Sequence, residues 1–307
     1  MATIKKQIKI TGVGIHSGAP VTMIINPSDA RGIFFHRADI GGGLISAAYD
    51  NVGDNSLRNT TVGTPPNTVS TIEHLMAALF MSGIDSAIIE IDGSEVPIMD
   101  GSALGFYKLL SPVAPDYSPA RQIIVKREIV VKKREVMRQI SFIKRMFAII
   151  HDWFLGRRNN GYVHLTPDSR GLVIDATFDY PDKIIGRQSM EYIFDGTQKS
   201  VDDFVNNIAS ARTFGRYSEW EYLKKRGMAR GANEGNVIAL NDRGDGTINK
   251  LQWPDEFVRH QVVDVLGDMF TSGGVIVGRI KLYKGGHAMS NLVLRKLFSD
   301  PENYDII

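Results

Sequence analysis

Residues 70–91, STIEHLMAALFMSGIDSAIIEI, predict a helix followed at once by a strand. Ser70 to Glu73 has the form of a capping box, in which a hydroxyl and a glutamate three positions later bond the free N–H groups at a helix start. The apolar run after it supplies a buried helix face, and Gly83 ends the helix. The segment from Ser86 to Ile91 is apolar enough for a buried strand. This succession indicates a sheet layered against helices, an α+β fold.

The chain on both sides of this unit repeats the same alternation. Further elements are predicted as strands at 7–11, 21–25, 32–36, 122–131, 162–165, 172–178 and 274–283, and as helices at 103–110, 201–208 and 257–270. A polar stretch rich in Gly and Asn reaches Pro66, and a Pro-rich segment at 112–119 is typical of a linker. We therefore expect two similarly built α+β halves, 1–120 and 121–307, each a β-sheet layered against helices.

Composition narrows the classes of function. The chain has 307 residues, of which 43% are hydrophobic, enough for roughly two domains with their own cores. The formal net charge of +2 is too small for a protein that coats nucleic acid, so no nucleic-acid partner is expected. The absence of cysteine excludes disulfides, thiolate metal sites and cysteine nucleophiles, so any metal must bind His, Asp or Glu. Because the sequence shows neither a secretory signal nor a long apolar run, we expect a cytoplasmic protein.

One segment, 132–158, is strongly basic. It holds eight basic and two acidic residues, a local charge of +6, and its apolar residues fall at helical spacing. An amphipathic helix is predicted there. Two interpretations stay open: the helix packs on the protein's own core, or it lies on an anionic membrane surface and holds the protein there.

The histidines suggest a metal site. His260 and Asp264 are spaced i, i+4, so both lie on one helix face as two ligands of one metal require, although such a pair is more often a surface hydrogen bond. His74 directly follows Glu73, a carboxylate that could deprotonate a bound water or serve only as the capping glutamate. Two His and one Asp would hold zinc and leave its fourth position open.

A further histidine, His287, lies in KGGHAMSN at the end of the last predicted strand. It is either an ordinary loop histidine or the acid that completes the chemistry of a metal-dependent hydrolase. Asp268, one turn along the helix from Asp264, could orient such an acid.

Six ordered segments resemble the motifs of the UDP-3-O-acyl-N-acetylglucosamine deacetylases, zinc amidases of lipid A synthesis in Gram-negative bacteria. They are TGVGIHSG (11–18), STIEHLMAALF (70–80), PIMDGSA (97–103), SARTFG (210–215), FVRHQVVDVLGDMF (257–270) and YKGGHAMSN (283–291). The resemblance implies two α+β halves with the active site between them. It also implies that His74, His260 and Asp264 bind Zn²⁺, for which Fe²⁺ could substitute in vivo.

The same resemblance implies roles for the remaining candidates. Glu73 is expected to be the general base and His287 the general acid, paired with Asp268. Thr213 is expected to stabilise the oxyanion, Phe214 to border the acyl-chain passage, and Lys284 to lie near the sugar nucleotide. The candidates for catalysis are thus Glu73, His287, Asp268 and Thr213, and those for substrate binding are Phe214, Lys284 and Gln261.

Gln261 departs from the family pattern, which usually has Lys directly after the second zinc histidine. A lysine at this position would hold the phosphates of the nucleotide, so its replacement by Gln261 affects substrate binding. The implied partner is a UDP-linked acylated glucosamine substrate, and we expect a monomer. The alternatives are a zinc amidase for another substrate and, from a different class, a non-catalytic peripheral membrane protein on the same scaffold.

Overall fold

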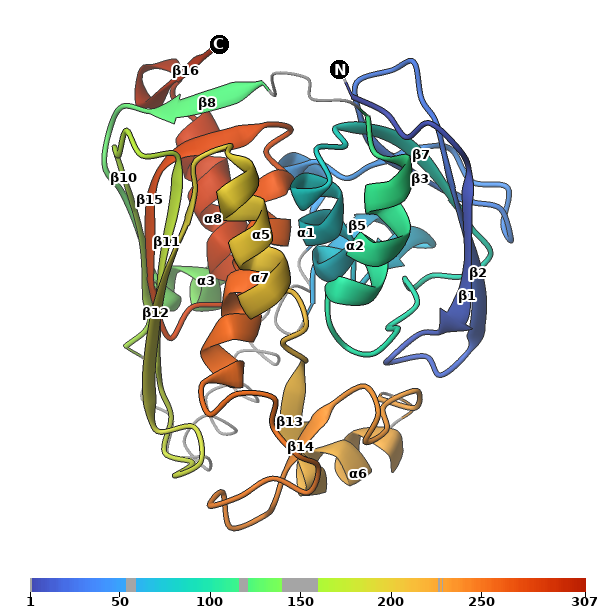
Figure 1. Ribbon diagram of the computed structural model, residues 1–307, viewed down its shortest axis with the longest axis vertical. Coiled ribbons are helices and arrows are strands. Elements are labelled where there is room, and N and C mark those ends of the chain that lie inside the picture. The colour runs from blue at the N-terminus through green and yellow to red at the C-terminus, as the bar shows by residue number, and fades with distance from the viewer. Residues whose placement is uncertain (1, 54–58, 116–120, 140–159, 226, 228) are drawn as a thin grey trace.

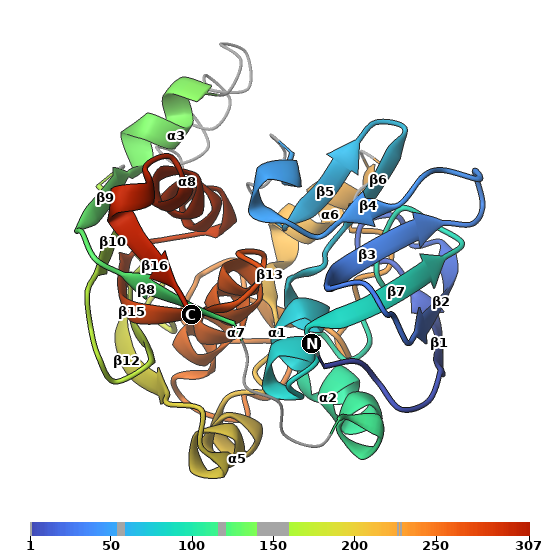
Figure 2. The same ribbon diagram turned by 90° about the horizontal axis from the view of Figure 1, so that it is seen from above.

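The computed structural model describes residues 2–53, 59–115, 121–139, 160–225, 227 and 229–307. Two halves stand face to face, with their sheets on the outside and their helices in the middle (Figure 1). The view from above shows the same layers, with α1 and α7 adjacent at the centre (Figure 2). The α+β architecture of two halves predicted from the sequence is therefore confirmed.

The first half is a mixed sheet with the strand order β1-β2-β7-β3-β4. Alternate residues of β2 and β3 are buried, as expected for a sheet with one face on a core. The helices cover this inner face, and a β5-β6 hairpin extends beyond the sheet (Figure 2). The elements are β1 (Ile8–Val13), β2 (Pro20–Asn26), β3 (Gly32–Arg37), β4 (Ile45–Ser46), η1 (Tyr49–Asn51), β5 (Thr61–Thr64), β6 (Asn67–Ser70), α1 (Glu73–Met81), β7 (Ser86–Ile91), α2 (Leu104–Leu110) and η2 (Ser111–Val113).

The second half repeats the plan with a larger sheet of order β12-β11-β15-β10-β9. The start of β15 also pairs with β8, which in turn pairs with β16 near the C-terminus. Helices α5, α7 and α8 lie on the side of this sheet that faces the first half (Figure 1). The elements are β8 (Gln122–Val125), β9 (Ile129–Lys132), α3 (Lys133–Gln139), β10 (Tyr162–Thr166), β11 (Leu172–Asp179), β12 (Arg187–Phe194), α5 (Gln198–Asn207), α7 (Glu256–Phe270), β15 (Val275–Tyr283), α8 (His287–Phe298), η3 (Pro301–Asn303) and β16 (Tyr304–Ile306).

A small lobe projects from the second half (Figure 1). It consists of β13 (Phe214–Arg216), α6 (Tyr217–Lys225) and β14 (Ile238–Leu240), with β13 and β14 paired in parallel. The lobe begins directly after Thr213, and its first residue is Phe214, so two residues expected at the active site lie where the chain enters the lobe.

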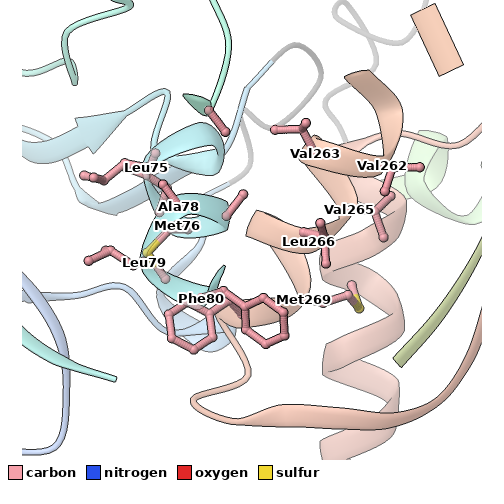
Figure 3. Packing of buried hydrophobic residues seen from close by; sticks show 14 of the residues in the cluster. Leu75, Met76, Ala78, Leu79, Phe80, Val262, Val263, Val265, Leu266 and Met269 are labelled. Atoms are coloured by element: carbon pink, nitrogen blue, oxygen red, sulfur yellow. The ribbon is translucent and has the colours of Figure 1, made fainter. Parts of the chain in front are cut away.

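Helices α1 and α7 join the two halves through apolar contacts. Figure 3 shows Phe80 of α1 lying between the two helices, whereas Leu75 and Leu79 point away from α7. The Phe80 ring contacts the ring of Phe270 in α7 with centroids 5.4 Å apart, and both side chains are buried. The helices approach so closely that a Cβ atom on Gly267 would lie 1.9 Å from the carbonyl oxygen of Glu73. Position 267 must therefore be glycine for this packing.

The predicted capping box at 70–73 is wrong. Ser70 belongs to β6, and its hydroxyl donates to the carbonyl of Ser94 rather than to the helix. The residue before α1 is Ile72, which provides no side-chain cap. The local pattern fails because the backbone at Ser70 is already used by strand pairing, which leaves the Glu73 carboxylate free for another partner.

Other boundaries also differ from the sequence prediction. The single strand expected at 122–131 is two strands, β8 and β9. Strand β8 pairs with β15, whereas β9 pairs with β10. The polar stretch before Pro66 contains β4 and β5, and His287, expected in a loop, is the first residue of α8. Short strands with few apolar residues carry little signal of their own, since partners distant in sequence stabilise them.

The basic segment is described only at its beginning. Val136 and Met137 of α3 are buried. Oε2 of Glu135 forms an ion pair with Nζ of Lys296 in α8 at 2.7 Å. Residues 140–159, which carry most of the predicted amphipathic helix, lie outside the described residues, as do 116–120 of the predicted linker. Membrane contact through 132–158 therefore stays a prediction. None of the helices that the structure describes is long and apolar enough to span a bilayer.

Candidate active site

Three expected metal ligands converge where α1 meets α7. His74 lies in the first turn of α1, and His260 and Asp264 lie one turn apart on α7. The Nε2 atoms of both histidines are 3.5 Å from Oδ1 of Asp264, and the three potential ligand atoms lie within 4.8 Å of one another. The two imidazole rings are nearly perpendicular, with centroids 4.9 Å apart. The structure thus forms one buried cluster from two halves of the chain.

This cluster fits a divalent metal ion. Two imidazole nitrogens and one carboxylate oxygen are a usual ligand set for zinc, and three protein ligands leave a coordination position for water or substrate. Nδ1 of His260 lies 3.0 Å from the carbonyl oxygen of Ala211, a contact that orients the ring and leaves Nε2 for the metal. Burial lowers the pKa of His260 and so favours the neutral form that binds metal.

The carboxylate of Asp264 is also in its ligand form. Burial raises its pKa, but the charge of His260, the hydrogen bond from His74 and the charge of His287 together hold that pKa below its ordinary value. The site therefore presents an anionic oxygen between two imidazoles, an arrangement that favours a cation.

Glu73 lies beside the cluster and is 4% exposed. Its Oε2 atom accepts a 2.9 Å hydrogen bond from the backbone N–H of Thr60. Burial raises the pKa of Glu73, while the charges of His287 and His74 and the Thr60 bond oppose that rise. The raised pKa makes this carboxylate a stronger base than an exposed glutamate.

His287 and Asp268 form a pair next to the cluster, with Asp268 buried and His287 partly buried. Nδ1 of His287 lies 3.1 and 3.0 Å from the two oxygens of Asp268, and its Nε2 lies 4.0 Å from Asp264. Burial lowers the pKa of His287, but the charge and hydrogen bond of Asp268, with Asp264 and Glu73, raise that pKa well above its usual value. The raised pKa favours the protonated form of the imidazole, whose Nδ1 side is occupied by Asp268.

Thr213 and Phe214 lie at the entrance to the small lobe. The N–H of Thr213 donates to Gly101 and its carbonyl accepts from Ile238, which fixes the backbone at this position. The ring of Phe214 packs edge-on against Phe257 with centroids 5.0 Å apart and lies 6.3 Å from the ring of His260. Phe214 therefore borders the metal-ligand cluster.

The two remaining candidates for substrate binding are Gln261 and Lys284. Gln261 follows His260 on α7 and is buried. Lys284, at the end of β15, places its Nζ 3.3 Å from Oδ2 of Asp179 and its backbone N–H 3.0 Å from the carbonyl of Thr177. The charge of Lys284 is thus paired with the carboxylate of the last residue of β11.

Two residues at the site were missed by sequence reasoning. Thr60, at the end of the polar stretch, contacts Glu73 and Asp268, and the sequence around it gives no signal for this. Gly267 did carry a signal, because an isolated glycine inside an apolar helix usually has a packing reason.

Comparison with known proteins agrees with the resemblance of the sequence motifs. Residues 1–299 match the family model described as LpxC, UDP-3-O-acyl N-acetylglycosamine deacetylase. The chain is 35% identical over 307 residues to the UDP-3-O-acyl-N-acetylglucosamine deacetylase of Myxococcus xanthus, covering 99% of this chain and 88% of that protein. It is 34% identical to the proteins of the same name from Teredinibacter turnerae and Pasteurella multocida, in each case covering 99% of this chain and 92% of the relative.

Proposed function

This chain belongs to the UDP-3-O-acyl-N-acetylglucosamine deacetylase family of lipid A biosynthesis, and from that membership we propose that it is a zinc-dependent hydrolase. The reaction is hydrolysis of the acetamide of UDP-3-O-acyl-N-acetylglucosamine, which releases acetate and leaves a free amine. The observation that carries the proposal is the buried cluster of His74, His260 and Asp264 with Glu73 and His287 around it.

The three clustered side chains would hold the metal. A zinc ion held by these residues would supply Lewis acidity, lowering the pKa of a water and polarising the acetamide carbonyl. The same nitrogen and oxygen ligands also suit Fe²⁺, so the ligand set does not determine which of the two metals is used in vivo.

Glu73 acts as the general base. Its carboxylate must be ionised to take the proton of the attacking water, and the N–H of Thr60 stabilises this form. Glu73 directly precedes the proposed metal ligand His74 in the chain, and this adjacency supports its role as the base.

His287 acts as the general acid. Asp268 binds Nδ1 and so fixes the ring with Nε2 directed to the cluster. The protonated ring donates its Nε2 proton to the departing amine as the carbon–nitrogen bond breaks. The hydroxyl of Thr213 stabilises the oxyanion, and Phe214 borders the acyl-chain passage.

Substrate binding is proposed for Lys284 and Gln261. Gln261 replaces the lysine usual at its position in the family, so Lys284 remains as a cation for the sugar nucleotide. The substitution is also the one observation that favours the second candidate function, a zinc amidase acting on a different substrate.

The test measures acetate released from UDP-3-O-acyl-N-acetylglucosamine by the purified protein. Release should stop after the metal is removed with a chelator and return when Zn²⁺ is added. A protein with bound metal that releases no acetate from this substrate would favour the second candidate function. Release that continues after complete metal removal would contradict a metal-dependent mechanism.

A further inference from the structure

Thr60 contacts both carboxylates that serve the proposed proton transfers. It is a buried residue directly before β5 in the first half, 3% exposed. Its backbone N–H donates to Oε2 of Glu73 at 2.9 Å, and its hydroxyl donates to Oδ1 of Asp268 at 2.6 Å. Asp268 lies 208 positions later in the chain. A single residue thus links the candidate base to the partner of the candidate acid across the two halves.

We propose that Thr60 is a positioning residue for the deacetylation, because its hydroxyl fixes the Asp268 carboxylate and through it the imidazole of His287. This inference rests on the proposed function, since it names a further residue of the same site. The contact itself does not depend on a metal, because it joins only side chains of this protein.

The geometry at Asp268 shows why a second contact is needed. Nδ1 of His287 lies almost equally far from the two carboxylate oxygens, at 3.1 and 3.0 Å. A carboxylate with this partner alone could rotate about its Cβ–Cγ bond and still keep a contact with the ring. The short bond from Thr60 holds Oδ1, and bonds from a hydroxyl to an ionised acceptor are among the stronger ones. The plane of the carboxylate, and so the direction of the ring, is fixed.

The hydroxyl of Thr60 is itself held in place. The carbonyl of Thr60 accepts from the N–H of Ile72 at 3.3 Å, and its N–H is bonded to Glu73. Both contacts tie the backbone of this residue to the start of α1. The position of the hydroxyl is therefore fixed relative to the helix that carries His74. The acid and the metal ligand on α1 are thus held in a fixed arrangement.

Side-chain variants separate this role from the backbone contact. Thr60→Val keeps the branched shape and the N–H but removes the hydroxyl, whereas Thr60→Ser keeps the hydroxyl. Thr61→Val is the matched control: it removes the neighbouring hydroxyl, whose partner is Asn59 at 3.3 Å. All three variants leave the proposed metal ligands intact, and metal content is measured for each.

We expect Thr60→Val to lower kcat by about 10-fold while KM and metal content stay near the wild-type values, the signature of a contact that matters in the transition state. Thr60→Ser should restore most of the rate, and Thr61→Val should match the wild type. In an Asp268→Ala background, Thr60→Val should cause no further loss, because the two residues act through one contact.

A second readout does not use activity. In ¹⁵N-histidine NMR of the metal-free protein, the Nδ1–H signal of His287, assigned by its loss in His287→Ala, should move in Thr60→Val and stay in Thr60→Ser. The inference is overturned by a kcat of Thr60→Val within about twofold of wild type, by an equal loss in the Asp268→Ala background, or by an unmoved signal. If the wild type releases no acetate, the proposed function fails, while the NMR comparison still tests the placement.

Discussion

Replacing Gly267 by alanine should push α1 away from α7 and weaken both the fold and metal binding. The new Cβ would lie 1.9 Å from the carbonyl oxygen of Glu73 and 2.7 Å from its carbonyl carbon. Both atoms belong to the backbone, so no side chain can rotate to make room. The closest contact must lengthen by about 1.1 Å to reach 3.0 Å, the lower limit for such pairs. The two helices must therefore separate locally.

The size of the effect follows from two opposing terms. Overpacking a well-packed interior costs about 1–3 kcal/mol, and this contact is backbone against backbone, which favours the upper part of that range. Replacing glycine by alanine within a helix stabilises the folded state by about 1 kcal/mol, because alanine has the higher helix propensity. We expect a net loss of about 1–2 kcal/mol in the free energy of unfolding.

The displacement also reaches the metal ligands. Glu73 precedes His74 on α1, whereas His260 and Asp264 belong to α7 with Gly267. Metal–ligand distances tolerate changes of only about 0.2 Å, so a shift of about 1 Å between the helices should lower metal affinity by about 10-fold or more. A loss of both stability and metal affinity distinguishes separation of α1 from α7 from a packing defect elsewhere in the core, which would lower stability alone.

The measurement is urea unfolding of the metal-free protein together with a metal titration. Removing the metal first separates the packing cost from stabilisation by ligand binding. Gly43→Ala is the matched control, because a Cβ there meets no atom within 4 Å and its backbone needs no positive φ. If Gly267→Ala unfolds at the wild-type urea concentration and binds metal with wild-type affinity, the close approach of α1 and α7 is wrong.

The other predictions concern the chemistry of the site. Alanine at any one of the three proposed metal ligands should sharply lower metal content by elemental analysis, and full occupancy in all three variants would refute the assignment. Glu73→Gln should keep the metal and the fold but lower kcat by ~10²-fold or more, whereas an unchanged rate would leave Glu73 a structural role only. Because His287 must be protonated and its pKa is raised, kcat/KM should fall as pH rises through that pKa, and His287→Ala should remove this alkaline limb from the pH profile. On the acid side, kcat/KM should fall as pH drops through the burial-raised pKa of Glu73. Gln261→Lys should lower KM for the UDP-linked substrate with little change in kcat, and a higher KM would point to a different ligand.

Local sequence relations predicted part of the site. The i, i+4 spacing of His260 and Asp264, and Asp268 one turn further, place all three on one side of α7 because the helical repeat is a local property. The adjacency of Glu73 and His74 likewise depends only on the chain. The resemblance to a known family supplied the roles of these residues, which spacing alone left open.

Other features depended on contacts between distant parts of the chain. The capping box at Ser70 was a valid local signal, but strand pairing in β6 and the bond to Ser94 replaced it. The start of α8 at His287 was not visible either, because two glycines precede it and resemble a loop. At Ser70 the competing interactions were formed by residues outside the window that local patterns can describe.

The sequence by itself determined the two-layered halves, the ligand pair on α7 and the identity of the side chains available for chemistry, since periodicity and composition act within a few residues. Only the tertiary structure decided that His74 meets that pair, that Asp268 turns to His287, and that the hydroxyl of Thr60 joins them. The physical reason is the packing of α1 on α7. Because Gly267 lets the two backbones nearly touch, hydrogen-bonding groups from both halves come within 3 Å, a distance that no local pattern encodes.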